Sequence, residues 1–356
     1  MQIIDSPQHT RHDPPFEILD GERTPYFEAP RRAAIIAGAL AAAGFPAPTA
    51  PREFGLGPLL AVHRQDYVEY LERAHGRWVA AGLSPDGVMP CTLPLGGMAG
   101  RSTAPTAEAG RYCFDLSAPI VAGTYAAARC AADAALTGAE VLLAGTRAAY
   151  ALCRPPGHHA MPALAGGYCY LNNAAIAAHH LAAAAQPPDA EVDRRPWAMA
   201  PPSVAVLDID YHHGNGTQAI FYERSDVLFA SIHADPDREY PYFLGFADER
   251  GAGPGEGYNL NIPLEAGVDD ARYLAALEQA LEAIAAYSPR YLVVSVGLDT
   301  FAEDPLGDFA LTSAAYPAIG ARIAQLGLPT LFVQEGGYAV EALGNNVVEL
   351  LRGYES

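Results

Sequence analysis

The sequence predicts an α/β protein in which a parallel β-sheet is covered by helices on both faces. Short apolar runs of strand length alternate with longer segments whose apolar residues recur at helical spacing, a pattern typical of strands joined by crossover helices. Hydrophobic residues make up 50% of the 356 residues, which is enough for a large core. Each motif of chemically reactive side chains follows directly after an apolar run, where open α/β sheets place their ligand sites.

The expected strands are mostly continuous apolar runs, as is typical of strands buried on both faces of a sheet. They are Gln2–Ile4, Tyr150–Cys153, Val204–Ile209, Val227–Ile232, Tyr258–Ile262, Tyr291–Val296 and Thr330–Val333. The expected helices carry apolar residues three and four positions apart, which places those residues on one face. They are Arg31–Ala43, Asp66–Ala81, Ala122–Leu136, Asn173–Ala184, Asp270–Ala286, Ser313–Gln325 and Val340–Leu351. No internal repeat or linker divides the chain, so we expect a single domain over residues 1–356.

Two segments interrupt this alternation. Residues 84–117 are rich in Gly, Pro, Thr and Ala and are too long for a plain connection. Loops of this size often shape a binding site or an interface. Residues 186–202 carry five prolines and mixed charges, and we expect them to form a surface insertion.

The composition excludes several classes of function. The formal net charge is -19, and all 22 basic residues are arginine. Without lysine the chain has no Schiff-base nucleophile and no phosphate-loop lysine. It also has no basic stripe for a nucleic-acid backbone, so we expect no nucleic-acid partner. An acidic field attracts cations, although an acidic surface also serves solubility alone.

Other features bear on the cellular compartment. No run of 18 apolar residues lacks a charge or a breaker, so we expect no membrane span. The segment Met1–Pro7 has no basic region ahead of an apolar stretch, and a cytoplasmic protein is therefore expected. The five cysteines form no C-x-x-C pair. We expect them to be small buried side chains rather than disulfides or nucleophiles.

Two carboxylates and an imidazole at strand ends indicate a divalent metal site. Asp208, Asp210 and His212 occupy alternate positions where one predicted strand ends and therefore point the same way. Asp299 follows another strand. Asp210, His212 and Asp299 with one open position match a catalytic zinc site, and the same donors accept iron(II) or cobalt(II). A solvated Asp/His turn is the alternative for the first motif taken alone.

A histidine pair suited to acid–base catalysis follows a further strand. His158 and His159 come after Pro-Pro-Gly, and imidazole titrates near neutral pH. We expect Asp208 and Asn215 each to accept a hydrogen bond from one of the two rings, which would give the rings different tautomers and pKa values. After the last strand, two glycines allow close backbone approach to a ligand, and Tyr338 is placed to donate to a developing oxyanion.

Five separated motifs carry a resemblance to a known family. They are Arg154–Ala160, Gly166–Asn173, Asp208–Gln218, Gly297–Pro305 and Glu335–Tyr338. In this order they resemble the histone deacetylase superfamily, whose fold is similar to that of arginase. The likeness spans essentially the whole chain and is strongest to the bacterial acetylpolyamine amidohydrolases. Asn215 makes the chain more similar to class II than to class I deacetylases, which have aspartate there. Further matching segments are Phe27–Arg31, His63–Tyr67 and Phe243–Gly245.

The resemblance implies a zinc-dependent amide hydrolase. The implied zinc ligands are Asp210, His212 and Asp299. His159 resembles the general base that later protonates the leaving amine, and His158 resembles its electrostatic partner. Tyr338 resembles the tyrosine that donates a hydrogen bond to the oxyanion.

The resemblance also implies a set of substrate contacts. They are Glu17, Gly167, Tyr168 and Tyr240. Gly167 would offer its carbonyl oxygen to the scissile N–H, and the two tyrosines would wall a tunnel. Glu17 matches an acid that meets the cationic end of a polyamine, but Ser117 stands where the relatives have glutamate. Asp115 and Glu108 are candidates to replace that glutamate.

Members of the family further carry structural monovalent cations, K⁺ or Na⁺. The first site is implied at Asp208, Asp210, His212, Ser231 and Ile232. The second site is implied at Phe221, Arg224, Val227 and Tyr258. Residues 84–117 match, in place and length, an insertion that forms a homodimer interface and narrows the tunnel.

The expected function is therefore zinc-dependent deacetylation of small acylated amines, above all acetylpolyamines, by a homodimer. A deacylase of acyl-lysine in proteins, or of another small amide, is the alternative with the same chemistry. A binuclear ureohydrolase needs two further aspartates where this chain has Gly214 and Phe301, neither of which binds metal. A non-catalytic binder of acyl-amines would lack part of the constellation, such as His159 or Tyr338, and all of it is present.

Overall fold

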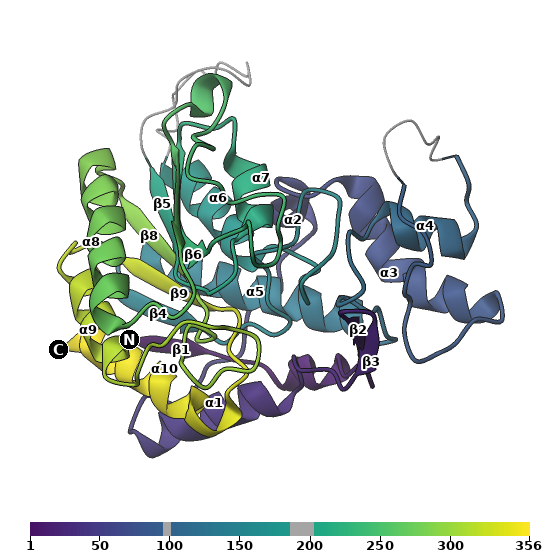
Figure 1. Cartoon of the computed structure of the whole chain (residues 1–356), viewed down its shortest axis with the longest axis horizontal. Helices are drawn as coiled ribbons and strands as arrows, with labels where there is room; N and C mark the ends of the chain where they lie inside the picture. Colours follow the sequence, from purple (N-terminus) through teal and green to yellow (C-terminus); the bar gives the residue numbers. More distant parts are fainter. Residues whose placement is uncertain (95–100, 186–202) are drawn as a thin grey trace.

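The computed structural model describes residues 1–94, 101–185 and 203–356. Within them the core is a sheet of seven parallel strands in the order β1-β4-β9-β8-β5-β6-β7 (Figure 1). The strands are β1 (Gln2–Ile4), β4 (Ala148–Ala151), β5 (Val204–Asp208), β6 (Val227–Ala234), β7 (Asn259–Leu264), β8 (Tyr291–Val296) and β9 (Thr330–Gln334). The predicted parallel sheet is confirmed, with strand ends shifted by at most two residues. The predicted surface insertion at 186–202 lies outside the described residues.

Helices cover both faces of this sheet, as predicted. Helices α1, α8, α9 and α10 pack on one face and α5 and α6 on the other (Figure 1). The helices are α1 (Arg31–Ala42), α2 (Gly57–Leu60), α3 (Gln65–Ala80), α4 (Pro105–Arg111), α5 (Thr124–Leu143), α6 (Asn173–Ala185), α7 (Asn215–Phe221), α8 (Asp270–Tyr287), α9 (Ala315–Ala324) and α10 (Val340–Glu355). The sequence did not predict α2, α4 and α7, because four to seven residues are too few to show a helical period. Across the described residues, no helix combines the length and apolar character needed to cross a membrane.

The central strand β5 shows why its sequence is continuously apolar. Val204 and Val206 belong to the core beneath α5 and α6, whereas Ala205 and Leu207 belong to the opposite core. Successive side chains of a strand point to opposite faces, and both faces of β5 are buried. Because both faces need apolar residues, no polar alternation remains in the sequence.

The strand order reverses at β5. From β5 the chain continues to β6 and β7 at one edge, and it then returns to place β8 on the other side of β5. Asp208 at the end of β5 is in register with Ser295 of β8, so the carboxyl ends of the two strands adjoin. A reversal of this kind leaves a crevice between the loops that follow the strands, which is where α/β sheets bind ligands.

A small hairpin that the sequence analysis did not predict precedes α1. Strands β2 (Glu17–Leu19) and β3 (Glu22–Thr24) pair antiparallel across a two-residue turn. Asp20 and Gly21 form this turn, and their φ angles of 52° and 82° are both positive. Asp-Gly is a strong sequence signal for a turn with two positive φ angles, so the hairpin could have been found.

The described residues of the inserted segment 84–117 lie beyond one end of the sheet. Its helix α4 packs beside α3, and both helices project away from the strands (Figure 1). Glu108 of α4 forms ion pairs with Arg73 and Arg77 of α3, which fixes the position of α4. Residues 95–100 of this segment lie outside the described residues.

Candidate active site

Three candidate metal ligands meet at the crevice between β5 and β8. Asp210 and His212 follow β5, and Asp299 follows β8. Their ligand atoms all lie within 4.8 Å of one another. His212 Nδ1 is 3.4 Å from Asp210 Oδ1 and 3.2 Å from Asp299 Oδ2. The predicted metal-ligating set is thus brought together in space.

Backbone groups hold the two carboxylates in place. The Gly336 N–H donates to Asp210 Oδ2 at 2.9 Å, and the Tyr211 N–H donates to Asp299 Oδ1 at 3.0 Å. A Cβ atom at Gly297 or Gly336 would collide with these carboxylates. Glycine is therefore needed at both positions, because the backbone passes directly over the carboxylates.

The chemistry of this donor set fits a divalent cation. Asp210 and Asp299 are both buried, and burial together with the charge of Asp210 raises the pKa of Asp299 to about 7. Burial alone would raise the pKa of Asp210, but His158 and His212 outweigh it and lower that pKa. Two buried carboxylates side by side are costly unless a cation neutralises them, and two carboxylates with one imidazole suit catalytic zinc.

The histidine pair lies beside these ligands with its rings oriented by different partners. His158 Nδ1 is 3.1 Å from Asp208 Oδ2, and His159 Nδ1 is 2.6 Å from Asn215 Oδ1. The two ring centroids are 4.0 Å apart. Both predicted hydrogen-bond partners are therefore in place. Asp208 faces His158 rather than the candidate metal ligands.

These partners separate the pKa values of the two histidines. Burial lowers the pKa of His158, but the charges of Asp210 and Asp208 outweigh it and raise the pKa to about 10. Burial and the charges of His158 and His212 hold the pKa of His159 well below its usual value. The two shifts run in opposite directions, so His158 is the more basic ring and His159 is the ring suited to accept a proton from water.

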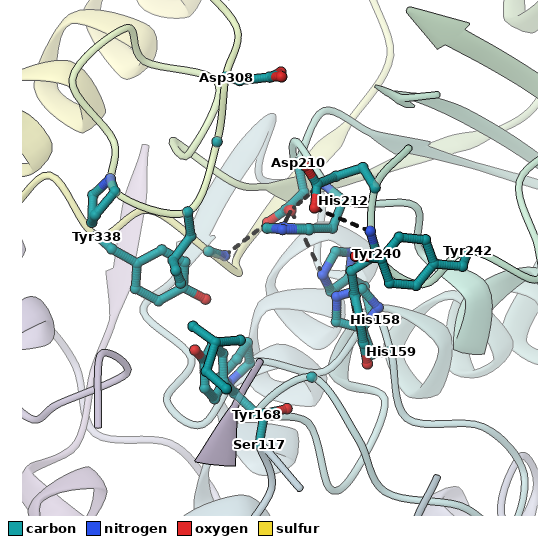
Figure 2. A pocket seen from close by; sticks show the side chains of 18 of the residues that line it. Ser117, His158, His159, Tyr168, Asp210, His212, Tyr240, Tyr242, Asp308 and Tyr338 are labelled. Carbon is teal, nitrogen blue, oxygen red and sulfur yellow. Dashed lines mark hydrogen bonds and ion pairs between the residues drawn. The ribbon is translucent and has the colours of Figure 1, made fainter. Parts of the chain in front are cut away.

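Tyr338 lies on the opposite side of the pocket from the histidines (Figure 2). The Arg32 guanidinium lies 4.7 Å from its ring centroid, and the Tyr168 ring is 5.6 Å away. The Tyr338 N–H donates to Asp304 Oδ2 at 2.6 Å. Burial raises the pKa of Tyr338 well above its usual value, so its hydroxyl stays protonated and can donate a hydrogen bond.

Asp210, His212, the two histidines of the pair and Tyr338 open into one cavity of about 360 Å³, whereas Asp299 lies outside its described lining. The described residues that line it include the candidate catalytic groups, the implied contacts Gly167, Tyr168 and Tyr240, and Ser117, which Figure 2 shows close to Tyr168. Gly167 has a φ of 53°, and a Cβ there would collide with the His159 ring. The Tyr240 ring meets the His159 ring edge-on at 5.0 Å. The cavity is therefore narrow beside His159.

Three predicted acids lie outside the described lining of this cavity. Glu17 is buried behind Tyr168, where its Oε1 accepts from the Tyr168 hydroxyl at 3.1 Å and from the Phe27 N–H at 3.2 Å. Burial raises the pKa of Glu17 to about 7. Asp115 lies behind Gly167, and Glu108 is paired with arginines of α3.

The carboxylates that do line the cavity mouth were missed by sequence analysis. They are Asp20, Glu239 and Asp308. Asp20 and Asp308 are exposed, and the Tyr211 hydroxyl lies 2.7 Å from Asp308 Oδ1 and 3.1 Å from Glu239 Oε2. The Asp-Gly turn could have revealed Asp20. Glu239 and Asp308 lie in irregular segments with no sequence signal of their own.

The two implied monovalent-cation sites lie at opposite ends of β6. Asp208 and Ser231 are in register across β5 and β6, at the same end as the candidate metal ligands. Val227 begins β6 at the other end, near Phe221 at the end of α7, where the Arg224 N–H donates to the Phe221 carbonyl oxygen at 2.9 Å. Tyr258 precedes β7 at this end, and its carbonyl oxygen accepts from the Phe229 N–H.

Comparison with known proteins identifies the family. The model of the histone deacetylase domain matches residues 26–354. The chain is 48% identical to acetylpolyamine amidohydrolase 2 of Pseudomonas aeruginosa, covering 100% of this chain and 99% of that protein. It is 42% identical to the acetylpolyamine amidohydrolase of Mycoplana ramosa, covering 99% of each. The crystal structure of acetylpolyamine aminohydrolase from Burkholderia pseudomallei superimposes with a TM-score of 0.91 at 39% identity, covering 100% of this chain and 99% of that one. The resemblance found in the sequence is confirmed: the chain belongs to the histone deacetylase family of metal-dependent amidohydrolases.

Proposed function

We propose that this protein is a zinc-dependent deacetylase of small, cationic acylated amines, above all acetylpolyamines. One observation carries the proposal: a single cavity connects a buried hydrolytic centre to three carboxylates at its mouth. Relatives that match over essentially the full chain are named acetylpolyamine amidohydrolases. A polyamine chain bound with its acetyl end at Asp210 and His212 would direct its ammonium groups toward the acidic mouth.

The roles of the residues follow from their geometry. Zinc, held by Asp210, His212 and Asp299, would supply Lewis-acid polarisation of the amide carbonyl and of the attacking water. His159 would accept the proton of that water and return it to the leaving amine.

The remaining groups would stabilise charge and orient the amide. His158, the more basic of the two rings, would stabilise the negative charge that develops. The Tyr338 hydroxyl would donate to the carbonyl oxygen as it becomes anionic. The Gly167 carbonyl oxygen would accept from the amide N–H, while Tyr168 and Tyr240 would enclose the methylene chain.

Two further features belong to the proposal. The residues grouped at the two ends of β6 would bind K⁺ or Na⁺ as structural ions.

Residues 84–117 would form a homodimer interface, which is supported by Val79 of α3 and Leu93 of the inserted segment, whose exposed fractions are 41% and 36%. A Leu93→Asp variant should elute as a monomer in size-exclusion chromatography with light scattering, and a variant that stays dimeric would contradict this interface. The cytoplasmic location remains an expectation from the sequence.

The test of the function is a substrate panel with zinc-loaded enzyme and a chelator-treated control. We expect kcat/KM to be higher for N-acetylputrescine, N-acetylcadaverine and N8-acetylspermidine than for an acetyl-lysine peptide. The uncharged analogue N-butylacetamide has the same carbon chain as N-acetylputrescine and isolates the contribution of the cation. A preference for the peptide would instead favour the alternative deacylase of acyl-lysine, and equal rates for the charged and uncharged amides would contradict cation recognition.

A further inference from the structure

The carboxylate of Asp115 joins the inserted segment to both walls of the cavity. Its Oδ2 accepts three hydrogen bonds, from the Gly167 N–H at 2.6 Å, the Tyr240 hydroxyl at 2.8 Å and the Ser117 hydroxyl at 2.9 Å. Its Oδ1 accepts from the Ser117 N–H at 3.1 Å. All four partners are donors. An ionised carboxylate, which only accepts hydrogen bonds, satisfies them all.

Two of these partners lie against the candidate general base. The Tyr240 ring contacts His159 edge-on, with centroids 5.0 Å apart, and lies 6.0 Å from the His212 ring. Gly167 holds a left-handed backbone conformation so close to His159 that a Cβ would overlap the imidazole. The positions of Gly167 and Tyr240 relative to His159 therefore depend on the hydrogen bonds made by the Gly167 N–H and the Tyr240 hydroxyl.

Cys113 and Phe114, which precede Asp115, also contact the residues that enclose the cavity. Cys113 and Ala165 form a parallel bridge, in which the Phe114 N–H donates to the Ala165 carbonyl oxygen at 3.0 Å. The Phe114 ring stacks on Tyr240 at 6.2 Å, and a Cβ at position 166 would collide with that ring. These contacts bring the end of the inserted segment directly behind the cavity wall.

We propose that Asp115 is a positioning residue for the reaction, whose carboxylate anchors both Gly167 and Tyr240 and thereby fixes their separation across the cavity. Asp115 lies outside the described residues that line the cavity, so it acts through these two residues rather than on the substrate. The inference rests on the proposed function for its substrate. It predicts that ligands long enough to lie between the walls depend on Asp115, whereas ligands that reach only the metal do not.

The test compares Asp115→Asn, Tyr240→Phe and the double variant with wild-type enzyme, all zinc-loaded. Asparagine keeps the size of the side chain but must turn an N–H₂ group toward at least one of the four donors. The control is Asp133→Asn, because Asp133 also accepts a backbone N–H, that of Phe54 at 3.2 Å, but lies on α5 outside the described lining of the cavity.

The main readout is binding by calorimetry, because it does not need turnover. Asp115→Asn should weaken a hydroxamate with a six-carbon chain by roughly tenfold, the effect of one lost hydrogen bond in a critical position, while acetohydroxamate affinity and zinc content stay unchanged. In the Tyr240→Phe background the same substitution should cost less, because the two groups share one hydrogen bond.

Equal loss for both hydroxamates, additive effects in the double variant, or the same result for Asp133→Asn would overturn the proposal. Wild-type enzyme that binds the long hydroxamate but does not hydrolyse acetylpolyamines would overturn the proposed function alone.

Discussion

Substitution of Glu17 by glutamine tests the burial of this carboxyl group through protein stability. Burial raises the pKa of Glu17 from 4.5 to about 7. The folded protein holds this proton more tightly than the unfolded chain, so an ionised Glu17 destabilises the fold. The cost is absent below about pH 4.5, grows as the pH rises, and is complete above about pH 7. Since one pKa unit corresponds to about 1.4 kcal/mol, the full cost is about 3 kcal/mol.

Glutamine removes this titration and still offers an oxygen to the Tyr168 hydroxyl and the Phe27 N–H. We therefore expect the unfolding free energy of Glu17→Gln to rise relative to wild type by about 2 kcal/mol between about pH 5.5 and about pH 8, because part of the cost is already present at the lower pH. Urea unfolding at fixed zinc concentration measures this difference, and this range avoids the isoelectric point of 4.8. The exposed control Glu265→Gln should show no such trend. A Glu17→Gln difference that is independent of pH would refute the reasoning.

Three further substitutions test the site. His159→Ala should lower kcat by a factor on the order of 10² or more with unchanged zinc content, because the base is lost while the ligands remain; undiminished kcat would exclude this role. Asp299→Ala should lose zinc during dialysis that leaves wild type loaded, as measured by mass spectrometry of the metal, and full occupancy would show that the ligand set is wrong. Asp308→Asn combined with Glu239→Gln should raise KM for N-acetylputrescine by roughly tenfold at low salt, with N-butylacetamide unaffected. Equal losses on both amides would point to a structural effect instead.

The sheet and its attached motifs could be predicted because their signals are local. A run such as that of β5 is apolar throughout because both of its faces are buried, and the residues just beyond its end are directed into the crevice. The partners of His158 and His159 could be predicted for the same reason, since Asp208 and Asn215 belong to one short motif that begins at the last residue of β5.

Other parts of the site depend on contacts that no local pattern encodes. Glu239 and Asp308 meet through the hydroxyl of Tyr211, and each comes from an irregular segment. Glu17 was expected among the substrate contacts, whereas its carboxylate lies behind Tyr168. Whether Glu17 lines the cavity or lies behind its wall depends on how the β2–β3 hairpin packs against the rest of the protein. The sequence of the three-residue strand β2 does not reveal that packing.

The reversal of strand order at β5 links catalysis to assembly of the sheet. His212 and Asp299 are 87 residues apart in the chain and become neighbours only when β8 has paired with β5. A chain with β5 in place but β8 still undocked offers an incomplete ligand set, so tight metal binding requires both halves of the sheet to be joined. A metal that binds the native arrangement and not its separated parts would stabilise the folded state by mass action, and with it the pairing of β5 with β8. The metal centre proposed to cleave the amide is therefore complete only in chains whose sheet has fully assembled.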